Sequence, residues 1–297
     1  MQILATLSNM KDVAALVDLE SGEAARIPVR PEFIDAEIKE SNPCRPFGIT
    51  WTSDVLYVVN NKQLLMYDRT FDYLGTHAVP VHENTHQLAF HDGFVWAVSP
   101  RTNSLIGVRP AGEPGDEFDI FRQQRGAYVP RSSSEQDDLK HVNSLLWTDS
   151  KLYIAAHNFG PSFIMTFDSA SLRLVSLMQD VGGSIHGLAI DGDELFWLDT
   201  EGNAVRSSGG VHMTLQRTGF ARGFAMTREH YIVAISEISD RRSRISGDAY
   251  IHVIERASGS LLAEHRLIGT GNVNDLRLLD AFDLAHGVDP FKTAAAV

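Results

Sequence analysis

The stretch HVNSLLWTDSKLYIAAHN, residues 141–158, has the pattern of two short strands joined by a turn. The segments LLW and LYIAA consist of apolar, aromatic and β-branched residues that favour strands, and TDS between them is typical of a turn. Polar residues stand at both outer ends, with His141 and Asn143 at the start and His157 and Asn158 at the finish. Because a hairpin brings its outer ends together, the sequence predicts that these polar side chains lie on one face.

The same pattern recurs along the chain. Similar hairpins occupy residues 46–61, 85–100, 185–202 and 221–237, and GNVNDLRLLD (271–280) supplies a first strand without a second. Two more strands follow each hairpin, as in AYIHVIERASG and LLAEHRL. Four-stranded units repeated at irregular spacing, without any long helical pattern, indicate the blades of a β-propeller.

The two ends of the chain complete this pattern. The N-terminus has three strands that lack a first strand, and 271–280 provides the missing one. Pairing them removes exposed sheet edges. The sequence therefore predicts an all-β fold, a six-bladed β-propeller closed by pairing of the N- and C-terminal strands, as a single domain over 1–297. Segment 121–140 is expected to be an insertion loop and 281–297 a C-terminal tail. The first strands are expected to begin near Phe47, His86, His141, His186, Arg222 and Asn274.

Composition and charge narrow the classes of function. The chain has 297 residues, 43% of them hydrophobic, and a net charge of −12, which disfavours nucleic acid and anionic membranes as partners. It has no apolar run long enough for a membrane span, and its start lacks the features of a signal peptide. Cys44 is the single cysteine, which excludes an internal disulfide and suits a reducing compartment. We expect a cytoplasmic protein with a small-molecule substrate; composition does not address its oligomeric state.

The propeller pattern also predicts where a site would lie. First strands run nearest the axis of a propeller, so their starts lie around the central channel. The residues expected there are His86, His141, Asn143, His186, Arg222 and Asn274, and a second ring is expected to contain Asn60, His157, Asn158, Thr200, Glu201 and Glu237. Segment 121–140, which carries Arg125 and Tyr128, is expected to lie over the channel mouth as a lid that orders when a ligand binds.

Three histidines at the starts of consecutive first strands suggest a metal site, because converging imidazoles are natural metal ligands or acid–base groups. In this hypothesis His86, His141 and His186 hold a divalent transition metal: iron, manganese, zinc or copper. The alternative is a structural, hydrogen-bonded role for each histidine. Asn143 and Arg222 would orient the substrate, and Glu201 or Glu237 would act as a base. Further substrate contacts are expected from His157, Asn158, Asn274, Arg125 and Tyr128.

Two of these residues have structural alternatives. Asn143 could tie down a neighbouring blade, and Arg222 could pair with Glu201 or Glu237.

Two blades resemble a known superfamily. IHGLAIDGDELFWLDT (185–200) resembles the Asn-Gly-Leu-Ala…Asp-Gly…Leu-Tyr…Asp-Ser/Thr motif of the gluconolactonase, senescence-marker and strictosidine-synthase superfamily. HVNSLLWTDSKLYIAA resembles its Arg-x-Asn-Asp-Gly blade, with Asn143 at the matching asparagine. The resemblance implies a six-bladed propeller and, in the lactonases, an axial metal held by Glu, Asn and Asp. Here the corresponding strand starts carry Phe47 (or Pro46), His186 and Arg222, which favours nitrogen over oxygen ligands.

The functional prediction is a metal-dependent enzyme, a hydrolase, lyase or oxygenase, acting on a small polar metabolite in the axial pocket. One alternative is a metal-free lyase or isomerase with a histidine base and Arg222 as an anion clamp. The other is a propeller that binds a ligand or a protein without catalysis. The sequence contains no Gly-x-Ser-x-Gly elbow, Walker loop, dinucleotide fingerprint or His-Glu-x-x-His motif.

Overall fold

The computed structural model describes residues 1–9, 11–30, 45–113, 115–128, 140–157, 161–238 and 243–285. Cys44, Asn158, residues 129–139 of the predicted insertion loop and residues 286–297 of the predicted tail lie outside this description. The chain divides into two compact units. The first unit comprises Met1–Pro46 with Ile185–Val297, and the second unit comprises Phe47–Ser184.

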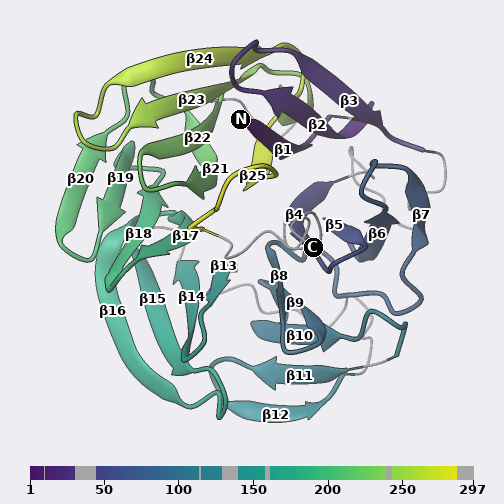
Figure 1. Ribbon diagram of the computed structural model, residues 1–297. Coiled ribbons are helices and arrows are strands. Elements are labelled where there is room, and N and C mark those ends of the chain that lie inside the picture. Colours follow the sequence, from purple (N-terminus) through teal and green to yellow (C-terminus); the bar gives the residue numbers. More distant parts are fainter. Residues whose placement is uncertain are drawn as a thin grey trace, which may run out of the picture. The chain divides into compact units, whose positions relative to one another are not determined.

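The strands form six antiparallel sheets, each of which is one blade of the predicted six-bladed β-propeller (Figure 1). The sheets of the first unit are β25 (Val273–Leu278), β1 (Gln2–Leu7), β2 (Asp12–Asp18) and β3 (Ala24–Pro28); β17 (His186–Asp191), β18 (Glu194–Asp199), β19 (Ala204–Ser207) and β20 (Gly210–Thr214); and β21 (Phe220–Met226), β22 (His230–Ser236), β23 (Ala249–Glu255) and β24 (Leu261–Leu267).

The sheets of the second unit are β4 (Pro46–Trp51), β5 (Leu56–Asn60), β6 (Gln63–Tyr67) and β7 (Tyr73–Thr76); β8 (Leu88–His91), β9 (Phe94–Ser99), β10 (Ser104–Val108), β11 (Asp116–Asp119) and β12 (Gln124–Ala127); and β13 (Val142–Trp147), β14 (Lys151–His157), β15 (Pro161–Asp168) and β16 (Leu174–Gly183). We call the first strand named in each sheet its inner strand and the last its outer strand. Inner strands such as β13 are buried, whereas the outer strand β16 is exposed along most of its length.

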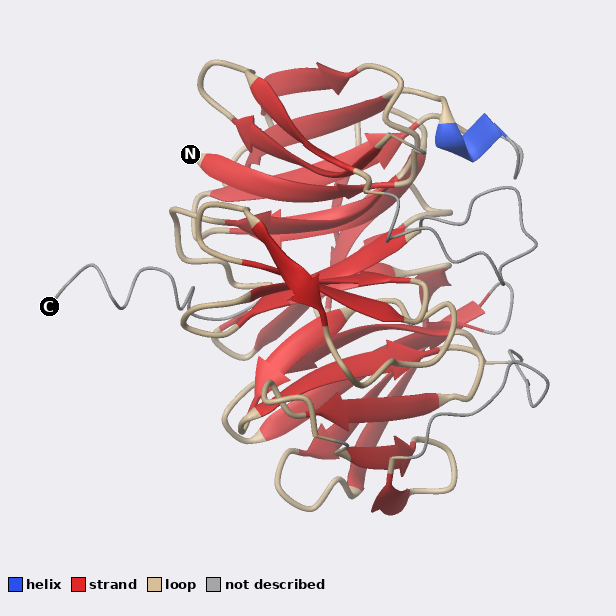
Figure 2. Ribbon diagram, turned by 90° about the vertical axis from the view of Figure 1, so that its right-hand side faces the viewer, coloured by secondary structure: helices blue, strands red, loops and turns tan. Residues whose placement is uncertain are grey.

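Strands account for nearly all the regular structure (Figure 2). In the described ranges the helical element is a single 3₁₀ turn, η2 (Ser243–Ile245). No helix among these residues is both long and apolar enough to cross a bilayer. The all-β prediction is therefore confirmed.

The two chain ends share one sheet, as predicted. β1 pairs antiparallel with β25, and the register places Ile3 opposite Leu278 and Ala5 opposite Leu276. This pairing satisfies backbone groups along the edge of β1 that would otherwise face solvent.

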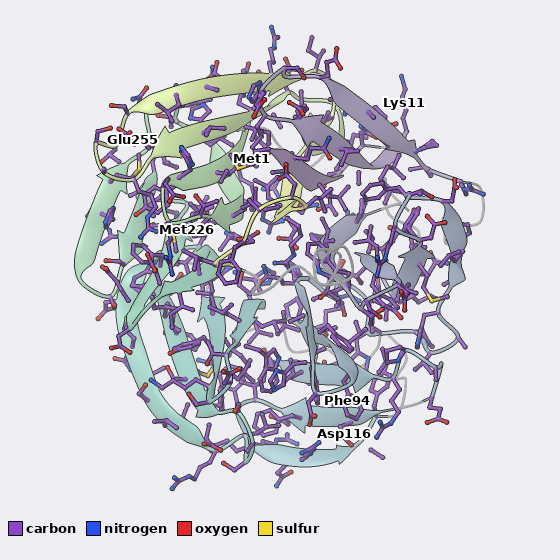
Figure 3. All side chains as sticks on the ribbon, viewed as in Figure 1. Met1, Lys11, Phe94, Asp116, Met226 and Glu255 are labelled. Carbon is purple, nitrogen blue, oxygen red and sulfur yellow. The ribbon has the colours of Figure 1, made fainter. Side chains whose placement is uncertain are left out.

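One part of the predicted organisation is wrong. Residues 124–127, assigned to the insertion loop 121–140, form the strand β12, which pairs with β11 from Asp116↔Ala127 to Asp119↔Gln124. Asp116, labelled in Figure 3, lies on β11. The chain turns back after Ile120, and the new strand satisfies backbone groups that would otherwise lie unpaired along β11. This sheet therefore has five strands.

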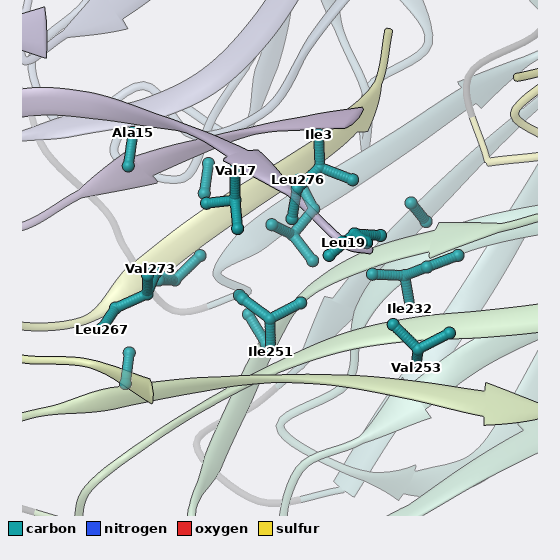
Figure 4. Close-up of a cluster of buried hydrophobic side chains, with 14 of the residues drawn as sticks. Ile3, Ala15, Val17, Leu19, Ile232, Ile251, Val253, Leu267, Val273 and Leu276 are labelled. Atoms are coloured by element: carbon teal, nitrogen blue, oxygen red, sulfur yellow. The ribbon is translucent and has the colours of Figure 1, made fainter. Parts of the chain in front are cut away.

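One hydrophobic core of the first unit lies between the sheet that contains both chain ends and the sheet β21–β24 (Figure 4). Ile3, Val17, Ile251, Val273 and Leu276 belong to one buried aliphatic cluster. Gly223 in β21 allows the close approach of β25, because a Cβ atom at this position would lie 2.7 Å from Leu276 Cγ.

Among the described residues, four inner strands carry a β-bulge near their start, and the residues just before β8 show a similar irregularity. At each bulge the inner strand has one more residue than the strand opposite, which disturbs the alternation of side chains between the faces. The extra residues are Gln87 before β8, Asn143 in β13, Gly187 in β17, Arg222 in β21 and Asn274 with Asp275 in β25. Bulges of this kind occur often beside functional sites.

Candidate functional site

Three predicted site residues meet in the first unit, where the inner strands β17, β21 and β25 begin. β21 packs beside both β17 and β25. Arg222 donates from Nε to His186 Nε2 at 3.0 Å and from one Nη atom to Asn274 Oδ1 at 3.1 Å. We call His186, Arg222 and Asn274 the arginine cluster.

Hydrogen bonds determine the protonation of His186. Thr200 Oγ1 donates to the carbonyl oxygen of Ala221 at 2.6 Å, so it accepts the 3.1 Å bond from His186 Nδ1. Nδ1 therefore carries the proton, and Nε2 presents the lone pair that accepts from Arg222. His186 is a neutral imidazole in this arrangement, and both of its nitrogens are engaged.

Asn274 is held just as firmly. Its Nδ2 donates to Ser8 Oγ and to the carbonyl oxygen of Pro46, both at 2.7 Å. Because this side-chain atom donates two hydrogen bonds, it must be the amide nitrogen of Asn274. The amide oxygen Oδ1 therefore faces Arg222 and accepts its hydrogen bond. The asparagine therefore fixes one edge of the guanidinium.

A second arginine lies near Arg222. The guanidinium carbon of Arg222 is 4.9 Å from the centre of the Phe220 ring, and that of Arg244 is 5.3 Å from the same ring. Burial, and then the positive charge of Arg244, lower the pKa of Arg222 to about 9. The cationic form of Arg222 is thus disfavoured by its own surroundings.

The backbone around η2 positions Arg244. The amide of Asn272 donates to the carbonyl oxygen of Arg244, and that of Gly271 donates to Gly247, both at 2.9 Å. These bonds attach the turn after Glu237 to the segment that leads into β25. The Arg244 side chain is exposed, whereas Arg222 is half-buried.

A different group of predicted residues meets in the second unit. Phe47 stacks on His86 with ring centres 4.5 Å apart, and the His141 ring lies 4.9 Å from His86 and 4.6 Å from His157. His141 and His157, the two ends of the hairpin 141–158, therefore come together as predicted. We call His86, His141 and His157 the histidine cluster.

The assumed equivalence of the strand starts is wrong by one or two residues. His86 and His186 directly precede a bulge, whereas His141 lies two positions before the bulge residue Asn143. Arg222 and Asn274 are themselves bulge residues. The alternation of apolar and polar residues along a strand does not reveal an inserted bulge residue. The strand starts that were treated as equivalent were therefore shifted by one or two residues relative to one another.

The metal hypothesis gains no support from this geometry. Within the described ranges, no group of three or more His, Cys, Asp or Glu side chains is arranged to hold a metal ion. His186 uses Nδ1 for Thr200 and Nε2 for Arg222, so coordination would require that one of these bonds break. A metal held by His86, His141 and His186 stays a prediction.

Two predicted substrate contacts, Arg125 and Tyr128, bind other groups of the protein. Arg125 lies on the outer strand β12 and donates from Nε to Asp116 at 3.0 Å. Tyr128 is buried, donates its hydroxyl to the carbonyl oxygen of Pro80 at 2.8 Å and packs edge-on against His82.

The remaining predicted site residues vary in their surroundings. Asn143 is buried at its bulge, whereas Glu201 and Glu237 are exposed. Glu237 accepts a bond from the amide of Asp248 at 3.1 Å.

Sequence reasoning missed Phe220 and Gln87. Phe220 precedes Arg222 by two residues, a spacing that could have indicated contact along a strand. Gln87 occupies its bulge as Asn143 does, and its Oε1 accepts from the amide of Leu145 at 2.8 Å. Gln87 therefore ties β13 to the preceding blade, the structural role that was an alternative for Asn143.

Comparisons with solved structures support the fold. A chain of the nidogen/laminin complex matches with a TM-score of 0.61 and 12% identity, covering 93% of this chain and 97% of that chain. A protein of unknown function from Bacteroides caccae gives a TM-score of 0.63 and 9% identity over the same shares of the two chains. Virginiamycin B lyase from Staphylococcus aureus matches more weakly, with a TM-score of 0.46 and 11% identity, covering 77% and 85%. Identities this low concern the fold alone.

No family model and no curated protein matches the sequence. Membership of the gluconolactonase, senescence-marker and strictosidine-synthase superfamily therefore stays a prediction.

Proposed function

We propose that the protein binds a small polar metabolite through a carboxylate or phosphate group, and that Arg222 is the residue that binds this group. His186 and Asn274 are positioning residues in this proposal, because they hold the guanidinium from two sides. The proposal develops the anion-clamp role that the sequence suggested for Arg222.

The observation that carries the proposal is the fixed orientation of a half-buried arginine. Two hydrogen bonds to neutral partners define the plane of the Arg222 guanidinium. A fixed planar fork suits the two oxygens of a carboxylate or phosphate, and it loses little entropy when it binds them.

Electrostatics support the same ligand class. Burial and the charge of Arg244 both oppose the cationic form of Arg222. An anion beside the two arginines would offset this repulsion, so the site favours a negatively charged group over a neutral one.

Catalysis by His186 as a base is less well supported. Its Nε2 lone pair accepts from Arg222, so His186 could take a proton from a substrate only after that contact breaks. We therefore propose binding, without assigning a reaction.

Isothermal titration with malonate tests the proposal, with inorganic phosphate as a second probe. Wild-type protein should bind malonate, and Arg222→Met should weaken binding about tenfold or more, because charged hydrogen bonds are lost. Arg228→Met is the matched control, since Arg228 lies in the exposed turn after β21 of the same blade. Equal malonate binding by Arg222→Met and Arg228→Met would overturn the proposal.

The pH dependence gives a second test of the same site. The pKa of Arg222 is about 9, so its charge is lost as the pH rises through that value. Malonate affinity should be steady from pH 7 to about 8.5 and should fall at higher pH by up to about tenfold per unit. A bound anion raises the pKa of Arg222, so the saturated complex should hold its proton to higher pH. Affinity that stays constant to pH 11 would contradict a role for Arg222.

A further inference from the structure

A separate pocket lies wholly within the second unit. Its volume is about 460 Å³, within the range of small-molecule sites. It is lined by the turn between β11 and β12, by residues of β15 and β16, and by Lys140. None of its lining residues belongs to the arginine cluster or the histidine cluster.

One end of the pocket is apolar. Met165 on β15 pairs with Leu177 on the outer strand β16, and Leu174 lies next to Gln123, whose Oε1 accepts from the Leu174 amide at 3.2 Å. Farther along the pocket, toward Ser162 at the start of β15, Phe121 and Phe163 meet edge-on with ring centres 6.4 Å apart. These side chains form a surface suited to a large aliphatic or aromatic group.

The opposite end carries one positive and one negative side chain. The carbonyl oxygen of Lys140 accepts from the amide of His157, which is the register partner of Ser162. Asp180 follows Gln179, the partner of Phe163. Lys140 and Asp180 thus lie at the same end of β15. Among the described residues, neither of them forms an ion pair.

The backbone at Asp180 is irregular. The register between β15 and β16 shifts between Phe163↔Gln179 and Pro161↔Gly183, which leaves additional residues on β16. Asp180 has a φ of 56°, a conformation that aspartate adopts more readily than most residues. A bulge of this kind changes the direction of a side chain, and here the residue affected lines the pocket.

We propose that this pocket binds a free α-amino acid with a large apolar side chain. The side chain lies against Met165, Leu174 and Leu177. The carboxylate binds Lys140, and the ammonium group binds Asp180. A zwitterionic head group matches one cation and one anion at a single end, whereas a simple acid or amine would contact only one of the two.

Titration of the full chain with three related probes tests the proposal. L-phenylalanine carries both charges, 3-phenylpropionate lacks the ammonium group and phenethylamine lacks the carboxylate. L-phenylalanine should bind, and each of the other two probes should bind about tenfold more weakly. Failure of L-phenylalanine to bind, or equal affinity for L-phenylalanine and 3-phenylpropionate, would overturn the proposal.

Variants of Lys140 and Asp180 test which group of the amino acid each side chain binds. In Lys140→Met, L-phenylalanine and phenethylamine should bind with similar affinity, because the carboxylate has lost its partner. In Asp180→Asn, L-phenylalanine and 3-phenylpropionate should bind with similar affinity. Unchanged discrimination in both variants would show that the head group binds elsewhere.

Variants on β16 test the apolar end. Leu177 lines the pocket and Val175 does not, although both are exposed on the same strand. Leu177→Gln should weaken L-phenylalanine binding about tenfold, and Val175→Gln should leave it unchanged. Equal effects of the two substitutions would contradict the pocket as the site. Arg222→Met should retain L-phenylalanine binding, and a loss in that variant would place the amino acid at the arginine cluster instead.

Discussion

His186 donates from Nδ1 to Thr200 Oγ1 and accepts at Nε2 from Arg222. Its type and its place at a strand start predicted a functional cluster, and it does lie with Arg222 and Asn274. Its role depends on Thr200, which fixes the proton on Nδ1 and leaves Nε2 for Arg222. A metal ligand and a hydrogen-bonded positioning residue look alike in sequence, because the difference lies in partners supplied by other strands.

The buried carboxyl group of Asp283 leads to a prediction about the pH dependence of stability. It is buried just after β25, and its carboxylate accepts bonds from the amides of Met226, Leu278 and Ala285. Burial is the main reason that its pKa is raised from 3.8 to about 6. The folded state therefore holds this proton to higher pH than the unfolded state does.

The free energy of unfolding should consequently decrease as the pH rises from about 4 through 6. A shift of this size corresponds to roughly 2–3 kcal/mol from Asp283 alone. Urea unfolding between pH 4 and 7.5 gives the free energy of unfolding of wild type and of Asp283→Asn at each pH. The decrease with pH should be smaller in Asp283→Asn, because the asparagine lacks this contribution. Asp193→Asn, at an exposed turn, is the control. An identical pH profile for wild type and Asp283→Asn would contradict the prediction.

At the scale of elements, alternation of apolar and polar residues predicted the strands but not their bulges. The hairpin 141–158 was correctly interpreted as two strands, because β-branched and aromatic residues alternate with turn chemistry. The extra residue at Asn143 leaves no such signature, since its position depends on the pairing with β14. The strand β12 was missed for a similar reason: its residues, QRGA, have little strand propensity, and pairing with β11 determines their conformation.

The position of Gly223 allows a test of how closely the inner strands β21 and β25 pack. A Cβ atom there would lie 2.7 Å from Leu276 Cγ and 3.0 Å from Ala234 Cβ. Gly223→Ala should therefore reduce the free energy of unfolding by about 1–3 kcal/mol, because β21 and β25 must move apart. Gly126→Ala is the matched control, since a Cβ atom there has no neighbour within 4 Å. Chemical denaturation of both variants would show the difference, and equal stability would contradict the packing argument.

At the scale of the whole molecule, repetition was the most informative signal in the sequence. Recurring hairpins predicted six blades and the pairing of the chain ends, and both are confirmed. A repeat predicts architecture well because every blade must bury the same faces. A repeat predicts a site poorly, because a site depends on residues that differ between blades. Arg222, which we propose binds an anion, occupies a bulge where another blade has Gly187.

Closure of the chain by β25 leads to the last prediction. Deletion of residues 271–280 removes Val273, Leu276 and Leu278 from the core of the first unit and leaves an edge of β1 unpaired. Burial of each aliphatic side chain contributes about 1.5–3 kcal/mol, so the total loss approaches the full stability of a typical domain. The deletion variant should therefore show no cooperative thermal transition. A synthetic peptide of residues 271–280 should restore that transition and a scrambled peptide should not, because the missing contribution is one specific strand. Cooperative melting of the deletion variant near the wild-type temperature would show that β25 is dispensable.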